Sequence, residues 1–106
     1  MSSLWIVHRD PGRRAALARV AGDASCLVGP PGDRGFDSAS SPDVVLLGLS
    51  GDLEAELEFA HRVASRHART SWVVVAEAPD LAEARRLFDT LPAEWMSYPP
   101  APDRLR

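Results

Sequence analysis

The chain contains no lysine, since all 12 of its basic residues are arginine. Reactions that need a lysine amine, as a Schiff base or as a phosphate partner, are therefore excluded. The chain also has a single cysteine, Cys26, so no disulfide can form within it, which fits a reducing, cytoplasmic setting. Cys26 stands in an apolar stretch without a neighbouring His or Arg to activate it, and we expect an inert, buried thiol.

Long apolar runs are missing too. No run approaches the roughly 20 residues that a membrane span requires, and no basic segment precedes the first apolar residues, so we expect neither a membrane anchor nor a secretory signal. The formal net charge is −3. Because a nucleic-acid-binding domain normally carries a basic patch, we expect no direct contact of this domain with nucleic acid. A length of 106 residues suits one compact domain.

Short apolar runs alternate with amphipathic segments along the chain. The apolar runs predict strands over residues 4–7, 25–28, 43–49, 71–76 and 94–98. Helical spacing predicts helices over residues 12–21 and 53–69 and a third helix after Pro79, with a short helix around residues 36–39 and a helical stub at 102–106. Asp10 and Asp52 stand where helix N-caps belong. Apolar strands alternating with amphipathic helices imply a parallel sheet covered on both faces.

Four of these segments resemble the receiver domains of two-component signalling. Residues 4–11 match the first strand and loop of that family, where an acidic pair follows the strand. Residues 42–49 match the third strand, which ends in aspartate, residues 71–76 the fourth, which ends in Thr or Ser, and residues 95–99 the fifth, which ends in Lys-Pro. The resemblance covers nearly the whole chain, apart from a short second helix and a truncated fifth helix.

This resemblance implies an α/β, flavodoxin-like (βα)5 receiver fold with a five-stranded parallel sheet in the order 2-1-3-4-5. It implies one receiver-like domain, residues 1–106, forming the N-terminal part of a longer protein. Receivers take a phosphoryl group onto the aspartate, with Mg²⁺ held by the acidic pair and with a hydroxyl and a lysine contacting the phosphoryl group. The corresponding positions in this chain hold His8, Arg9, Gly48, Ala76 and Tyr98.

None of these five residues can perform its counterpart's role. His8 and Arg9 lack the anionic oxygens that Mg²⁺ prefers, and Gly48 has no side chain to act as a nucleophile. We therefore predict a pseudo-receiver, without enzymatic activity, metal or cofactor. The resemblance implies a bacterial, phosphorylation-independent interaction domain that binds a protein partner or an output domain in cis, for example a transcriptional one. A docking or homodimer face is expected on the fourth helix and fifth strand, with Leu87, Trp95 and Tyr98.

Two other functions remain open at this stage. The space around Gly48 could serve a small-ligand or anion sensor, unless Tyr98 fills it. Alternatively, Asp52 could act as a relocated phosphoacceptor in an active receiver. Two local alternatives are also open: Arg9 either pairs with Asp52, which we favour, or binds an anion together with His8. Asp10, Asp52 and Glu77 are either helix caps and loop residues, which we favour, or a cation site.

Overall fold

The computed structural model describes residues 4–21, 27–32, 34–38, 41–50, 52–77, 81–89 and 91–97. Five strands form one parallel sheet in the order β2-β1-β3-β4-β5, as predicted. The strands are β1 (Leu4–Val7), β2 (Leu27–Gly29), β3 (Val44–Gly48), β4 (Ser71–Ala76) and β5 (Ala93–Ser97). The helices are α1 (Pro11–Ala21), α2 (Arg34–Ser38), α3 (Leu53–Arg66) and α4 (Leu81–Leu87). The flavodoxin-like order of the sheet is therefore confirmed.

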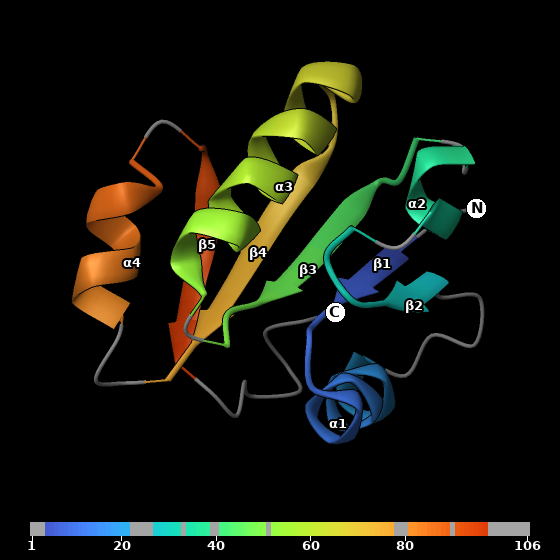
Figure 1. The fold of residues 1–106 in the computed structure, drawn as a ribbon, viewed down its shortest axis with the longest axis horizontal. Coiled ribbons are helices and arrows are strands. Elements are labelled where there is room, and N and C mark those ends of the chain that lie inside the picture. Colours follow the sequence, from blue (N-terminus) through green and yellow to red (C-terminus); the bar gives the residue numbers. More distant parts are fainter. Residues whose placement is uncertain are drawn as a thin grey trace.

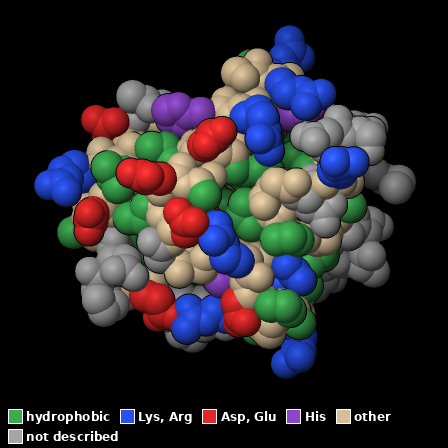
Figure 2. Space-filling view, in the orientation of Figure 1, with side chains coloured by type: hydrophobic (Ala, Val, Ile, Leu, Met, Phe, Trp, Pro, Cys, Tyr) green, Lys and Arg blue, Asp and Glu red, His purple; other side chains and the backbone are tan. Residues whose placement is uncertain are grey.

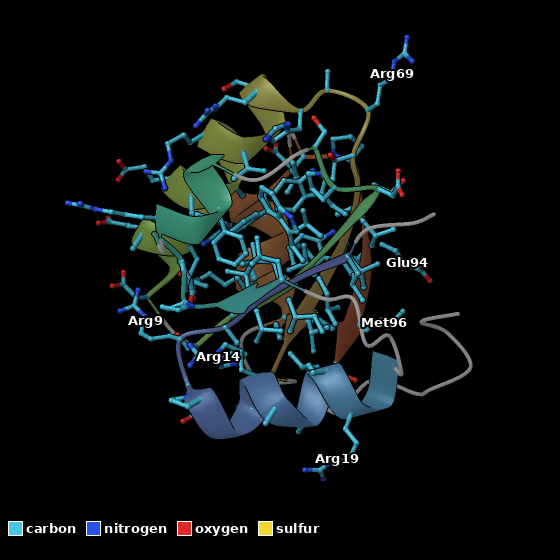
Figure 3. The ribbon with its side chains drawn as sticks, turned by 90° about the vertical axis from the view of Figure 1, so that its right-hand side faces the viewer. Arg9, Arg14, Arg19, Arg69, Glu94 and Met96 are labelled. Atoms are coloured by element: carbon cyan, nitrogen blue, oxygen red, sulfur yellow. The ribbon has the colours of Figure 1, made fainter. Side chains whose placement is uncertain are left out.

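The helices cover both faces of the sheet. Helices α2, α3 and α4 lie on one face, whereas α1 lies on the other (Figures 1 and 3). Each strand sends alternate side chains to opposite faces, so both faces are apolar. The larger core joins Trp5, Val45 and Val74 to α3 and α4, and the smaller core joins Ile6, Leu46 and Val75 to Leu17 of α1.

Local sequence signals explain where the long helices begin. The Asp10 carboxylate accepts a hydrogen bond from the backbone N–H of Arg13 (3.1 Å), and the Asp52 carboxylate accepts one from the N–H of Ala55 (3.4 Å). Both side chains thus satisfy backbone donors that have no partner within a helix, and the two predicted caps are confirmed. Helix α3 ends at Arg66, three residues before the predicted end, because His67 caps it.

Strand and helix bounds otherwise agree with the prediction within a few residues. The second helix is as short as expected, with 5 residues. Trp72 is buried in the core. Among the described residues, no helix has the length and apolar character needed to cross a membrane. Cys26, Tyr98 and the expected stub at residues 102–106 lie outside the described residues.

Candidate functional site

The site that the sequence singled out lies at the carboxyl ends of β1, β3 and β4. Val7 and Leu47 are partners in the parallel register of β1 and β3. The residues that follow them, His8 just after β1 and Gly48 at the end of β3, therefore lie side by side. A Cβ atom built onto Gly48 would lie 2.2 Å from Cδ2 of His8, which is far inside van der Waals contact. The imidazole therefore occupies the space that a side chain at position 48 would need.

This contact bears on one alternative that the sequence left open. The small residues Gly48 and Ala76 suggested a space for a ligand, unless Tyr98 filled it. His8 fills the space beside Gly48 instead, and its side chain is only 2% exposed. Ala76 is also buried, at the end of β4. The structure thus brings His8 and Gly48 into direct contact.

The His8 ring is held in one orientation by the backbone. Its Nδ1 atom accepts a hydrogen bond from the N–H of Asp10 (2.9 Å), so the proton of the neutral ring is on Nε2. Burial lowers the pKa of His8, and the nearby guanidinium groups of Arg13 and Arg14 lower it further, against the opposing effect of Asp10. His8 is therefore a buried, neutral wedge beside Gly48.

Arg9 points away from this wedge and makes the ion pair that we favoured from the sequence. Its Nη1 atom lies 3.1 Å from Oδ2 of Asp52, and both side chains are about half exposed. This pair joins the loop after β1 to the start of α3. Asp52, the residue proposed as a relocated phosphoacceptor, is thus engaged both as a helix cap and as a partner of Arg9.

An open hollow of about 280 Å³ remains outside the wedge. It is lined by His8, Asp10, Arg13, Ser50 and Glu77. Arg13 forms an ion pair with Glu77, which ties α1 to the end of β4. The hollow therefore has charges of both signs. Its cation, Arg13, pairs with the carboxylate of Glu77, and the carboxylate of Asp10 accepts a hydrogen bond from the backbone N–H of Arg13.

Glu56 is a residue of this region that the sequence reasoning missed. It stands in the acidic first turn of α3, yet its side chain is 0% exposed. Its Oε2 atom accepts hydrogen bonds from the N–H (3.0 Å) and the hydroxyl (2.7 Å) of Ser50. Burial raises the pKa of Glu56, although the two bonds from Ser50 oppose that rise. Glu56 thereby fixes the loop after β3.

A signal for the burial of Glu56 was present in the sequence. Glu56 lies three residues before Phe59 and four before Ala60, which places it on the buried face of α3. The ion pair of Arg13 with Glu77 had no such local signal, because its residues are 64 positions apart and belong to elements that are not neighbours in sequence. Only the folded arrangement brings them together.

No candidate metal site emerges from these carboxylates. Within the described parts of the chain, no group of three or more His, Cys, Asp or Glu side chains is placed to hold a metal ion. Asp10 and Asp52 serve as helix caps, and Glu77 pairs with Arg13.

The expected docking face lies at the β5 edge of the sheet, on α4 and β5. Leu87 is 39% exposed, whereas Trp95 is half-buried and packs edge-on against the ring of Phe88 at 5.9 Å between centroids. Trp95 therefore contributes both to the core and to the surface. Tyr98, the third residue of that expected face, lies outside the described residues.

Comparison with solved structures shows what this fold resembles. The N-terminal signal receiver domain of a two-component response regulator from Bacteroides fragilis superposes with a TM-score of 0.81 at 15% identity, covering 99% of this chain and 90% of that one. A response regulator from Colwellia psychrerythraea gives a TM-score of 0.76 at 17% identity, with 98% and 90% covered. The chain thus has the fold of a response-regulator receiver domain.

A longer protein contains the same fold as one part. NtrX from Brucella abortus matches with a TM-score of 0.75 at 16% identity, covering 99% of this chain but only 25% of NtrX. No protein-family model and no curated protein sequence matches the chain. At these identities the likeness concerns the fold alone.

Proposed function

We propose that the chain is a degenerate member of the receiver family, a signalling domain that works without phosphorylation. The observation that supports this proposal is the contact between His8 and Gly48. The ring of His8 takes the space in which a phosphoacceptor side chain would stand at position 48, and the neutral ring provides no ligand oxygen for Mg²⁺. Phosphoryl transfer depends on such a nucleophile, metal and compensating charge.

The proposed activity is protein binding in the cytoplasm of a bacterium. The partner is an output domain in cis, transcriptional or otherwise, or a separate protein, and α4 with β5 provides the docking face. Leu87 is one of two large apolar side chains that are exposed among the described residues, and Trp95 lies half-buried on the adjacent strand. Aromatic and apolar side chains of this kind are common anchors of protein interfaces.

An amide NMR titration tests the absence of phosphoryl chemistry. The protein is titrated with Mg²⁺ and then with beryllofluoride, a mimic of the aspartyl phosphoryl group, and an active receiver is titrated in parallel as the positive control. We expect no saturable shifts at residues 8–10, 48–52 or 76–77. Saturable shifts there would show a surviving phosphoryl site, with Asp52 as the first candidate for its acceptor.

The hollow favours a second candidate function, a sensor for a small anion. Arg13 and Ser50 line this space of about 280 Å³, and an anion bound there would replace Glu77 as the partner of Arg13 and Glu56 as the partner of the Ser50 hydroxyl. Inorganic phosphate is the probe in the same NMR experiment. Saturable shifts confined to the lining residues, lost in an Arg13→Gln variant, would support the sensor, whereas an unchanged spectrum at millimolar phosphate would eliminate it.

A further inference from the structure

The exposed side of α3 carries a row of four charges at a constant spacing of four residues. The row consists of Glu54, Glu58, Arg62 and Arg66, and all four residues are exposed. Two acidic residues are followed by two basic ones. On the face seen in Figure 2, acidic side chains lie near the lower end of α3 and arginine side chains near its upper end.

Such a row has the geometry of a helix-packing ridge. Residues four apart form one of the ridges along which helices pack against each other, with the axes crossing at about −50° when two such ridges lie side by side. The row is also complementary to itself. If a second copy of α3 lies antiparallel on the first, Glu58 of each copy faces Arg62 of the other, and Glu54 faces Arg66. The two-fold axis then passes beside the row, level with the midpoint between Glu58 and Arg62.

Two simpler explanations account for only part of this pattern. The helix macrodipole favours acidic residues at the start and basic residues at the end of a helix, but it does not place all four on one row. Pairing within the helix would join Glu58 to Arg62, yet no ion pair among the described residues connects them. The guanidinium of Arg62 lies instead over the ring of Phe59, 5.7 Å from its centroid.

We propose that α3 is a self-association surface, on which a second copy of this chain binds antiparallel through the row of four charges. The surface carries no large exposed apolar side chain in the described structure, and exposed ion pairs are individually weak. The dimer is therefore transient and strongly dependent on salt. It does not use Leu87 or Trp95, so the docking face on α4 and β5 stays available to a different partner.

Charge exchange between two variants tests the pairing directly. Glu54→Arg/Glu58→Arg makes the row entirely basic, and Arg62→Glu/Arg66→Glu makes it entirely acidic. Sedimentation equilibrium at low ionic strength measures association of the wild type, of each variant alone and of their equimolar mixture. We expect wild-type self-association, its loss in each variant alone, and association of the mixture at least about tenfold tighter than that of either variant alone.

Matched controls separate a local effect from a change in net charge. Arg19→Glu/Arg85→Glu alters two exposed arginines outside the row and changes the net charge as much as Arg62→Glu/Arg66→Glu does. This control should self-associate like the wild type. Circular dichroism confirms folding, and the milder pair Glu58→Arg and Arg62→Glu replaces any variant that does not fold.

The outcomes are decisive for this surface. A wild type that stays monomeric at low ionic strength, or a mixture that associates no more than its components, would overturn the proposal. The row does not include His8 or Gly48, and the proposed function does not depend on it. Failure here would therefore leave the result of the beryllofluoride titration unaffected.

Discussion

At the carboxyl edge of the sheet, an inner part around His8 and Gly48 is held by packing, whereas an outer part is held by ion pairs. In the inner part, His8 is wedged beside Gly48, both residues are buried, and shape determines the arrangement. In the outer part, Arg9 pairs with Asp52 and Arg13 with Glu77, and these side chains are partly exposed. Contacts fixed by shape are insensitive to salt, whereas exposed ion pairs are screened by it. The inner part should therefore dominate stability.

The largest expected effect comes from adding a side chain at position 48. Gly48→Ala places a Cβ against the His8 ring, and because overpacking displaces buried groups we expect a loss of about 1–3 kcal/mol in the free energy of unfolding, measured in urea. In the double variant His8→Ala/Gly48→Ala, the loss in the free energy of unfolding should be smaller than the sum of the two single losses, since removal of the ring makes room for the Cβ at position 48. A neutral Gly48→Ala variant would contradict the wedge.

Removal of the Glu56 carboxyl group should be nearly as costly. Glu56→Ala removes the acceptor of two Ser50 hydrogen bonds, and we expect a loss of about 1–3 kcal/mol in the free energy of unfolding. Urea unfolding measures this loss, and Ser50→Ala, which removes only the hydroxyl, serves as a smaller matched change. Equal stability of Glu56→Ala and wild type would show that the carboxyl group does not hold the loop.

A comparison of wild type with Glu56→Gln across pH tests which protonation state of Glu56 the folded protein favours. Burial raises the folded-state pKa of Glu56 above its unfolded value near 4.5, so the folded state holds the proton more tightly. This contribution to stability is full below pH 4.5 and is lost as the pH rises through the folded-state pKa. The stability of wild type relative to Glu56→Gln should therefore fall from pH 4 to pH 7. The opposite trend would mean that the ionised carboxylate is the favoured form.

His8 should act in the opposite direction on acidification. Its folded-state pKa is lowered below the unfolded value near 6.5, so the unfolded chain binds the proton more readily. The contribution of the neutral His8 ring to the free energy of unfolding is complete above pH 6.5. It falls at lower pH, with a slope of at most about 1.4 kcal/mol per pH unit for one proton. A His8→Asn variant, unfolded in urea across the same pH range, should lack this component. An identical pH profile in both proteins would contradict a buried neutral ring.

The smallest effect is expected in the outer part. Arg9→Gln or Asp52→Asn should cost less than about 1 kcal/mol, and moderate salt should remove the coupling between them. A double-mutant cycle at low and high salt measures this coupling, with Asp52→Asn retaining an oxygen that can still cap α3. A coupling that persists in high salt would show that the outer part is more rigid than its exposure indicates.

Sequence reasoning was successful where the signal was local. Apolar runs and helical spacing located the strands and helices, and the caps Asp10 and Asp52 were predicted from their positions before the helices. The strand order came from the resemblance to receivers and is confirmed. The pairing of Arg9 with Asp52 was also expected, since both residues were assigned to the same edge of the sheet.

The detailed content of the site could not be predicted in this way. The contact of His8 with Gly48 depends on the register between β1 and β3 and on the orientation of one ring. A sequence indicates that both residues end strands, but it does not indicate that one fills the space left by the other. The two residues that the sequence resemblance aligned with catalytic positions of receivers thus form a single packing unit.

NMR of the His8 ring tests whether it fills the space beside Gly48. We expect a nuclear Overhauser effect between the Hδ2 proton of His8 and the Hα protons of Gly48, with the ring neutral and protonated on Nε2 at pH 7. The imidazole nitrogen shifts should still show this tautomer at pH 6.5, where a solvated histidine is half protonated. A ring that titrates like a solvated histidine and shows no contact with Gly48 would contradict the buried wedge, because the space beside Gly48 would then be open.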